Sequence, residues 1–286
     1  MTVDPRQLTP LILSDRTFNW GERTYVMGIL NVTPDSFSDG GEFNQLEAAI
    51  AQVERMVAAG VDIVDVGGQS TRPGAEQISL DEELARVIPI IQAVRSRFDV
   101  PISIDTSRAA IAGAAVTAGA NLVNDISGGT FDEQMYATVA QLSVPYVLMH
   151  IRGTPATMQT RTSYQNLIAE ISTFFADRLE LAAQAGIAQE RIILDPGIGF
   201  AKTTEQNIEL LRRLREFDPL NAPLLIGPSR KSFIGHILEQ PNPKERVWGT
   251  AAACATAIAT RADILRVHDV AEMVQVCRVS DRLWRS

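Results

Sequence analysis

The sequence over residues 25–36 is YVMGILNVTPDS, an apolar run that gives way to polar residues from Asn31 onward. Apolar residues occupy consecutive positions of the run, as expected for a parallel strand that is buried on both faces. The polar residues begin where such a strand would leave its sheet. The stretch therefore predicts a buried strand over Tyr25–Leu30 with a polar loop at its carboxyl end.

Seven further runs of the same kind follow along the chain. The first of the eight runs begins at residue 25 and the last at residue 263. The average step is roughly 34 residues, which suits one strand plus one crossover helix. We predict these seven strands over Val61–Val66, Pro101–Asp105, Asn121–Asp125, Pro145–Met149, Ile192–Asp195, Pro223–Ile226 and Asp263–Val267.

The segments between the runs carry helix signals. In Leu46–Gly60 the apolar residues recur at helical spacing, and Gly60 suits the end of a helix. Ser79–Glu82 and Thr203–Gln206 have the pattern of a capping box at a helix start. Eight strands alternating with helices predict an α/β fold, namely a (β/α)8 TIM barrel, with an open doubly wound sheet as the alternative.

The first residues predict a small addition to the barrel. Leu11–Ser14 and Arg16–Trp20 suggest a short β-hairpin that plugs the barrel floor, and no linker or low-complexity segment follows. We therefore expect a single domain over residues 1–286, in which residues 1–22 form an N-terminal hairpin extension.

Composition excludes several classes of protein. The 286 residues are 45% hydrophobic and 21% charged, which is typical of a globular chain and not of a disordered or fibrous one. The net charge of -8 argues against a general nucleic-acid binder. We find no signal peptide and no apolar run suited to a membrane span, so we expect a cytoplasmic protein without membrane partners. Cys254 and Cys277 are read as small core residues.

Polar residues end nearly every predicted strand. Burying an unpaired neutral polar group costs roughly 2–7 kcal/mol, so stability alone does not explain so many of them. In a barrel, the carboxyl ends of the strands form the active site, and we expect these residues to share one pocket. The polar segments are residues 31–36, 67–73, 105–107, 124–125, 149–150, 195–197, 227–231 and 266–268.

Two kinds of chemistry meet among these residues. Cations suit a phosphate or pyrophosphate, and here they are Arg72, Lys231, Arg266 and His268. Hydrogen-bond acceptors and amides suit the edge of a nitrogen heterocycle, and here they are Asp105, Asn124 and Asp195. A polyanion beside a heterocycle suggests group transfer with a pyrophosphate leaving group.

Several motifs together resemble the dihydropteroate synthases. They are MGILNVTPDSFSDGG at 27–41, STRPG at 70–74, the segment at 149–159, DPGIGF at 195–200 and SRKS at 229–232. The resemblance spans about residues 25–270. It implies an enzyme of folate synthesis that joins 4-aminobenzoate to 6-hydroxymethyl-7,8-dihydropterin pyrophosphate, releases pyrophosphate and requires Mg²⁺.

The resemblance also implies roles for individual residues. It implies that the pterin is bound by Asp105, Asn124, Ile126, Met149, Asp195, Lys231 and Arg266. It implies that the pyrophosphate is bound by Asn31, Thr71, Arg72, Arg266 and His268, and that Asn31 is a ligand of the Mg²⁺ ion. It implies that the aminobenzoate site is formed by Thr71, Arg72, Pro73, Phe200, Lys231 and Ser232. Of these, we expect Asp105, Lys231, Arg72 and Arg266 to be catalytic, with loops around Thr33–Phe43 and Gly68–Ala75 closing over the site.

The expected mechanism is dissociative. An aryl amine is a weak nucleophile, so catalysis should rest on departure of the pyrophosphate, with cations neutralising its charge. The electron-rich pterin would stabilise the cationic methylene left behind. We find no case for a Ser/His/Asp nucleophile.

The chain departs from the family pattern at two places. Gln69 stands where Glu is expected, which removes a charge near Arg72, and Ile151-Arg152 replaces a pair that usually begins with Met. Two other functions stay open. One is the related barrel of methyltetrahydrofolate–corrinoid methyltransferases, which should lack the 71–73 and 229–231 motifs. The other is a catalytically silent pterin-binding paralogue. The resemblance also suggests a homodimer through the last two predicted helices, Lys244–Thr260 and Val270–Trp284.

Three other polar residues have a structural alternative. His236 lies in a helix-like run and is expected to be structural or solvated. Packing and ligand roles are both open for His150. Asp125 alternates with Asn124 and should point toward the barrel wall, where we expect a structural hydrogen bond.

Overall fold

The computed structural model describes residues 6–32, 42–71, 74 and 77–285. Within them, eight parallel strands form one sheet in the order β8-β7-β6-β5-β4-β3-β10-β9. The strands are β3 (Tyr25–Asn31), β4 (Ile63–Gly67), β5 (Ile102–Asp105), β6 (Leu122–Asp125), β7 (Tyr146–Met149), β8 (Ile192–Asp195), β9 (Leu225–Ile226) and β10 (Ile264–Val267). All eight predicted strands are present, with ends shifted by at most two residues.

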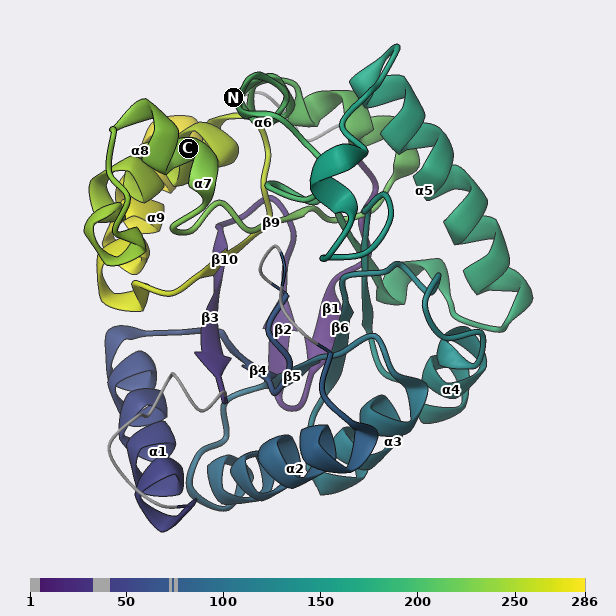
Figure 1. Ribbon diagram of the computed structural model, residues 1–286, viewed down its shortest axis with the longest axis vertical. Coiled ribbons are helices and arrows are strands. Elements are labelled where there is room, and N and C mark those ends of the chain that lie inside the picture. Colours follow the sequence, from purple (N-terminus) through teal and green to yellow (C-terminus); the bar gives the residue numbers. More distant parts are fainter. Residues whose placement is uncertain (1–5, 33–41, 72–73, 75–76, 286) are drawn as a thin grey trace.

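The sheet closes on itself between β8 and β9. Leu194 bridges to Leu224 in parallel, and its backbone N–H donates to the carbonyl of Pro223 at 2.9 Å. This contact joins the two outer strands of the sheet order, so the fold is the predicted (β/α)8 barrel and not an open sheet. Figure 1 looks into the barrel, with its helices arranged around the strands.

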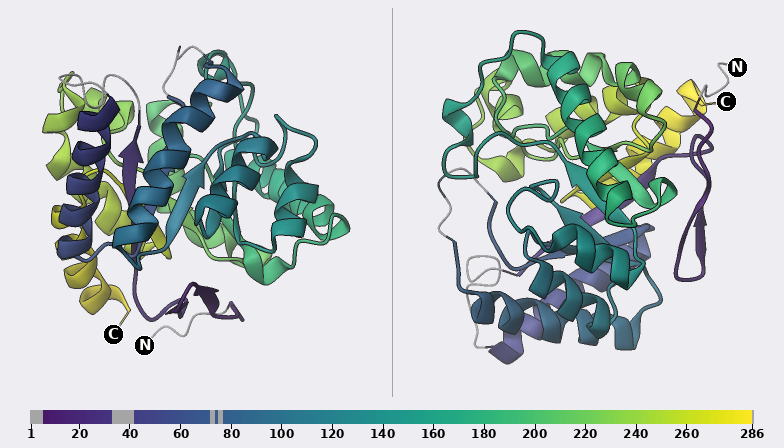
Figure 2. Two further views of the ribbon diagram at one scale, coloured as in Figure 1. Left: turned by 90° about the horizontal axis from the view of Figure 1, so that it is seen from below. Right: turned by 90° about the vertical axis from the view of Figure 1, so that its right-hand side faces the viewer.

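Helices cover the outer face of the barrel and lie between successive strands (Figures 1 and 2). The α-helices are α1 (Glu42–Ala59), α2 (Leu80–Arg97), α3 (Ala109–Ala118), α4 (Met135–Leu142), α5 (Leu167–Gln184), α6 (Thr204–Arg212), α7 (Ser232–Ile237), α8 (Val247–Ala259) and α9 (Val270–Trp284). Short 3-10 turns are η2 (Met158–Thr160), η3 (Gln189–Arg191), η4 (Leu214–Leu220) and η5 (Pro243–Glu245). No helix of the described chain has both the length and the apolarity needed to cross a bilayer.

Sequence signals explain where several helices begin and end. The Ser79 side chain accepts a hydrogen bond from the backbone N–H of Glu82 at 3.1 Å, while Thr203 and Gln206 complete a reciprocal capping box. Gly60 follows α1 with a φ of 93°, a conformation that glycine adopts without strain. These predicted signals are confirmed at α2, α6 and α1.

The predicted N-terminal hairpin consists of β1 (Leu11–Leu13) and β2 (Arg16–Phe18). Its apolar side chains pack against the lower interior of the barrel, where they form one cluster with a residue from nearly every strand. The cluster contains Leu11, Leu13, Phe18, Tyr25, Met27, Ile63, Leu122, Val147, Ile193, Leu225 and Ile264. Figure 2 shows the hairpin lying across one end of the barrel, which confirms the predicted plug.

Candidate active site

The floor cluster identifies which face of each strand points inward. Side chains alternate along a strand, so the residue two positions beyond each cluster member faces the same way. In the upper half of the barrel these residues are Ile29, Asp65, Asn124, Met149, Asp195, Gly227 and Arg266. The strand register aligns Asp105 with Gly67 and Asn124, which places Asp105 in the same upper layer. The barrel therefore collects polar side chains at the carboxyl ends of its strands.

Arg266 on β10 is the centre of a buried ionic network. Its Nε donates to Asp65 Oδ2 at 2.6 Å, and its Nη2 donates to Asp105 Oδ2 at 2.5 Å. Asn124 Nδ2 donates to the same Asp65 oxygen at 3.2 Å. Three predicted site residues from three different strands are thus connected, directly or through Asp65.

Burial changes the protonation of the acidic residues. Burial raises the pKa of Asp105 to about 7, against the lowering effect of the Arg266 guanidinium. Burial likewise raises the pKa of Asp195 to about 6, while the Gly197 N–H and Lys231 oppose the change. When the pKa of a carboxylate is raised in this way, hydrogen-bond donors stabilise its charged form. A ring edge rich in N–H groups supplies such donors.

The pKa values of the two cations in the site are shifted in opposite directions. Burial lowers the pKa of Lys231 to about 8, and the nearby charge of Arg266 adds to this effect. Burial alone would lower the pKa of Arg266 too, but the carboxylates of Asp65 and Asp105 raise it, so the guanidinium stays charged. Lys231 and Arg266 therefore hold positive charge at the mouth of the barrel near neutral pH.

An apolar wall lies beside these charges. Ile126, Met149 and Phe200 belong to one cluster with Ile151, Met158 and Ala201. Lys231 Nζ lies 4.1 Å from the centroid of the Phe200 ring, a cation–π contact. A flat heterocycle has both an apolar face and a polar edge, and this wall and the carboxylates match the two.

The loop after β8 is held tightly in place. Asp195 Oδ1 accepts a hydrogen bond from the backbone N–H of Gly197 at 2.7 Å. Gly197 has a φ of 74°, and a Cβ there would lie 2.1 Å from the carbonyl oxygen of His150, so only glycine fits. The buried Lys202 ammonium donates to the carbonyls of Gly197 and Phe200, each at 3.0 Å.

The structure describes some, but not all, of the residues predicted to bind the pyrophosphate and the aminobenzoate. His268 Nδ1 lies 3.0 Å from Ser229 Oγ, which fixes the imidazole at the end of β10. Asn31 is half-buried at the end of β3, Thr71 is half-buried, and Ser232 is exposed at the start of α7. Arg72, Pro73 and residues 33–41 lie outside the described residues.

Several polar residues predicted to be structural have partners within the protein. Asp125 accepts hydrogen bonds from Tyr146 Oη at 2.6 Å and from the backbone of the following loop, so its predicted structural role is confirmed. His150 is buried with its Nδ1 3.2 Å from Lys202 Nζ, which favours the packing role. His236 is exposed and contacts Thr204. Cys254 and Cys277 are buried free thiols, as expected.

Gln69 has a role that its neutral side chain explains. Its Oε1 accepts from the backbone N–H of Ile78 at 2.9 Å, and its Nε2 donates to the carbonyl of Ser70 at 2.9 Å. The amide therefore ties together the two ends of the loop after β4. A glutamate would retain the first bond but not the second, because a carboxylate cannot donate.

Sequence reasoning missed two buried charges, Asp65 and Lys202. Asp65 is fully buried inside an apolar run, and its alternation with Ile63 and Gly67 was the signal that would have placed it inside the barrel. Lys202 is 3% exposed, and its partners come from the loop after β8 and from His150, which the local sequence does not reveal.

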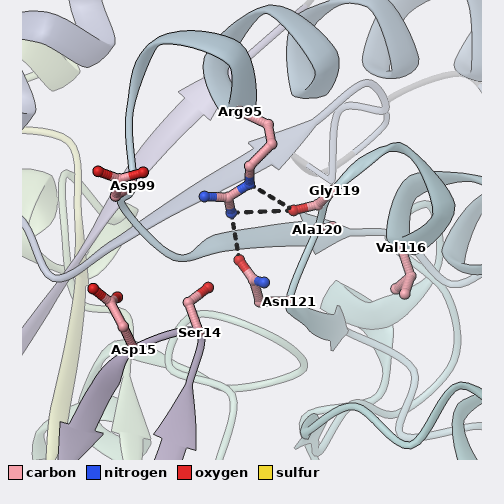
Figure 3. A pocket seen from close by; sticks show the side chains of 8 residues that line it. All are labelled: Ser14, Asp15, Arg95, Asp99, Val116, Gly119, Ala120 and Asn121. Atoms are coloured by element: carbon pink, nitrogen blue, oxygen red, sulfur yellow. Dashed lines mark hydrogen bonds between the residues drawn. The ribbon is translucent and has the colours of Figure 1, made fainter.

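A cavity of about 420 Å³ lies at the opposite end of the barrel (Figure 3). Arg95 crosses it and donates to the carbonyl of Gly119 and, at 2.6 Å, to Asn121 Oδ1. This arrangement ties α2 to the start of β6, so we interpret the cavity as a structural feature of the barrel floor.

Asn31 is a candidate ligand for the Mg²⁺ ion that the family resemblance implies. Among the described residues no group of three or more His, Cys, Asp or Glu side chains is arranged to hold an ion. Asn31 offers one neutral oxygen at the barrel mouth. Mg²⁺ commonly takes one or two protein ligands and completes its shell with substrate phosphates and water. A single oxygen from Asn31 is compatible with Mg²⁺ that takes its other ligands from a pyrophosphate and water.

Comparisons with known proteins identify the family of the chain. Residues 27–268 match the family described as pterin binding enzymes. A Synechocystis protein named dihydropteroate synthase is 62% identical over 276 residues, or 96% of each chain. Dihydropteroate synthase from Xanthomonas albilineans, solved with 4-aminobenzoic acid, has a TM-score of 0.89 at 40% identity and covers 96% of this chain and 97% of its own. Its structure with 7,8-dihydropteroate has a TM-score of 0.87 at 38% identity, covering 96% and 98%. The chain belongs to the pterin-binding enzymes and, within them, to the dihydropteroate synthases.

Proposed function

We propose that this chain transfers the 7,8-dihydropterin-6-ylmethyl group from its pyrophosphate ester to 4-aminobenzoate, forming 7,8-dihydropteroate and pyrophosphate. The observation that carries the proposal is the meeting of Asp105, Asn124, Asp195, Lys231 and Arg266 at one end of the barrel. These side chains combine buried acceptors for a heterocycle with cations for its leaving group.

The pterin would lie against the apolar wall with its polar edge toward the acids. Asp105, Asn124 and Asp195 would accept from the amine and ring N–H groups, and Lys231 would donate to the carbonyl side. Met149 and Ile126 would contact one face of the ring, with Arg266 near the other. Support comes from the burial of all three acceptors, which makes each hydrogen bond valuable in a low dielectric.

The pyrophosphate would lie toward Asn31, Thr71, Arg266 and His268, with Arg72 contributing from its loop. The carbon–oxygen bond breaks with its electron pair leaving on the pyrophosphate, and the cations stabilise that charge. The electron-rich dihydropterin stabilises the methylene cation, and Asp105 and Asp195 add negative potential close to it. The aminobenzoate nitrogen then attacks the methylene carbon and loses a proton.

The aminobenzoate site would include Phe200, Lys231 and Ser232, with Thr71, Arg72 and Pro73 on the second loop. Phe200 lies under the Lys231 ammonium, so one face of the benzoate ring would be apolar while the cation attracts its carboxylate. When bound with the pyrophosphate and Asn31, Mg²⁺ would neutralise leaving-group charge.

We also propose a homodimer that buries the exposed apolar surface of α7, α8 and α9, which lie together in Figure 1. Large apolar side chains there are unusually exposed, with Trp248 80% and Leu283 68% accessible. The others are Ile237, Leu238, Val279 and Trp284. A patch of this kind marks an interaction surface. The two free thiols support a reducing cytoplasmic location.

One assay tests the proposed activity. The purified chain is incubated with 4-aminobenzoate, the dihydropterin pyrophosphate and Mg²⁺, and products are identified by mass. We expect dihydropteroate and pyrophosphate in equal amounts, with turnover lost when the metal is chelated. Tight binding of the pterin substrate without any product would instead indicate the catalytically silent paralogue.

A further inference from the structure

Asp65 is a fully buried carboxylate within the barrel that none of the expected substrate contacts includes. The strand register pairs it with Ser103, and Ser103 pairs with Leu122 of the floor cluster. Like Asn124 and Arg266, Asp65 lies two residues beyond a member of the floor cluster and so belongs to the same inward-facing layer. Asp65 therefore lies among the polar side chains of the upper layer, and it is completely buried by them.

One oxygen of Asp65 holds two of the residues proposed to bind the pterin. Asp65 Oδ2 accepts from Arg266 Nε at 2.6 Å and from Asn124 Nδ2 at 3.2 Å. The Nη2 of the same guanidinium donates to Asp105 Oδ2 at 2.5 Å. Asp65 is thus the point through which β4, β6 and β10 fix their polar side chains relative to one another.

We propose that Asp65 is the positioning residue of the pterin site, acting through Arg266 and Asn124 without contacting the substrate. The inference rests on the proposed function. Bound at both Nε and Nη2, the guanidinium is held in one orientation, whereas a single partner would leave it free to swing about that bond. The amide of Asn124 is oriented too, since donation of Nδ2 to Asp65 turns its oxygen toward other partners.

The charge of Asp65 has a second effect on the site. A buried guanidinium needs a compensating anion. If Asp105 were the only anion within hydrogen-bonding distance, the Arg266–Asp105 pair would compete with the pterin for the Asp105 carboxylate. With Asp65 present, the guanidinium charge is compensated by a second carboxylate, and Asp105 retains capacity to accept from the ring.

The test is Asp65→Asn, which preserves shape but removes the carboxylate charge. We expect the affinity for the dihydropterin pyrophosphate, measured by calorimetry, to fall about 10- to 100-fold, since hydrogen bonds to charged groups contribute roughly 1.5–3 kcal/mol. The kcat/KM for that substrate should fall by a similar factor, while the KM for 4-aminobenzoate stays within about twofold. A general loss of structure would change both substrates alike.

Ser103→Ala is the matched control. Ser103 pairs with Asp65 in the strand register, is equally buried and has no hydrogen-bond partner for its hydroxyl among the described residues. Its substitution should leave both substrates within about twofold of the wild type. An Asp65→Asn protein with wild-type thermal stability and unchanged pterin affinity would overturn the proposal.

A second pair of variants covers the case in which Asp65→Asn does not fold. Adding Asp65→Asn to Arg266→Gln removes both charges of the pair, and this double variant is compared with Arg266→Gln alone. Pterin affinities within about threefold of each other are expected, because Asp65 acts mainly through the missing guanidinium. A further tenfold loss would overturn that route. The binding measurement needs no turnover, so it also separates this inference from a failure of the proposed activity.

Discussion

Lys202 gives the sharpest prediction about the loop that carries Asp195 and Phe200. Its ammonium is 3% exposed and has three partners, the carbonyls of Gly197 and Phe200 at 3.0 Å and His150 Nδ1 at 3.2 Å. Substitution Lys202→Met fills a similar volume and removes the charge. The variant should differ from the wild type in how its stability depends on pH.

The sign and size of that difference follow from the pKa. Burial lowers the pKa of Lys202 from 10.5 to about 7, and Lys231 and Arg152 add to the lowering while Asp195 opposes it. Between these two values the unfolded chain holds a proton that the folded chain has lost. Folded stability therefore rises with pH across this window, by up to about 1.4 kcal/mol per pH unit. From pH 7.5 to 9.5 the wild type should gain about 2.5 kcal/mol that Lys202→Met lacks.

Urea unfolding at pH 6.5, 7.5, 8.5 and 9.5 measures this difference. The chain has three lysines, and the exposed Lys244 provides the control. The stability of Lys244→Met should follow that of the wild type at every pH. The free energy of unfolding of the wild type minus that of Lys202→Met should rise by about 2.5 kcal/mol from pH 7.5 to 9.5. If the unfolding free energies of the wild type and Lys202→Met depend on pH in the same way, the claim that burial lowers the pKa of Lys202 to about 7 is refuted.

Three further predictions concern the site and the surface. Asp195→Asn replaces an acceptor oxygen by a donor, so pterin affinity measured by calorimetry should fall about 100-fold, and an unchanged affinity would remove Asp195 from the pterin site. Lys231→Met loses the cation over Phe200, so kcat/KM for both substrates should fall at least about 100-fold; a loss confined to one substrate would contradict its shared role. Trp248→Asp places a charge in the apolar patch, so light scattering at micromolar concentration should show a monomer for the variant and a dimer for the wild type. A dimeric variant would place the interface elsewhere.

The fold was largely predictable because it depends on a repeated pattern. Consecutive apolar residues marked each of the eight strands, and polar residues at their ends marked the mouth of the barrel. Register fixed what the pattern left open. The bridge between Leu194 and Leu224 decides between a closed barrel and an open sheet, and it depends on strand tilt, which no local signal encodes.

The site was predictable where chemistry is visible in single residues and less so where it depends on packing. Asp105, Asn124 and Arg266 stood out as polar residues in buried strands, and the structure links them. Asp65 was hidden because an apolar run averages over its one charge. Lys202 was hidden because its partners are backbone carbonyls and a histidine fifty-two positions away. Asp65 and Lys202 position other residues of the site through hydrogen bonds between distant segments, and these contacts become visible only in the folded barrel.

A crystal structure with the dihydropterin pyrophosphate tests the central claim most directly. We predict that the pterin ring lies between Met149 and Arg266, with its N–H edge on Asp105, Asn124 and Asp195 and its pyrophosphate toward Asn31 and His268. Density for the ligand at the hairpin end of the barrel, or a pterin turned away from all three acceptors, would contradict it.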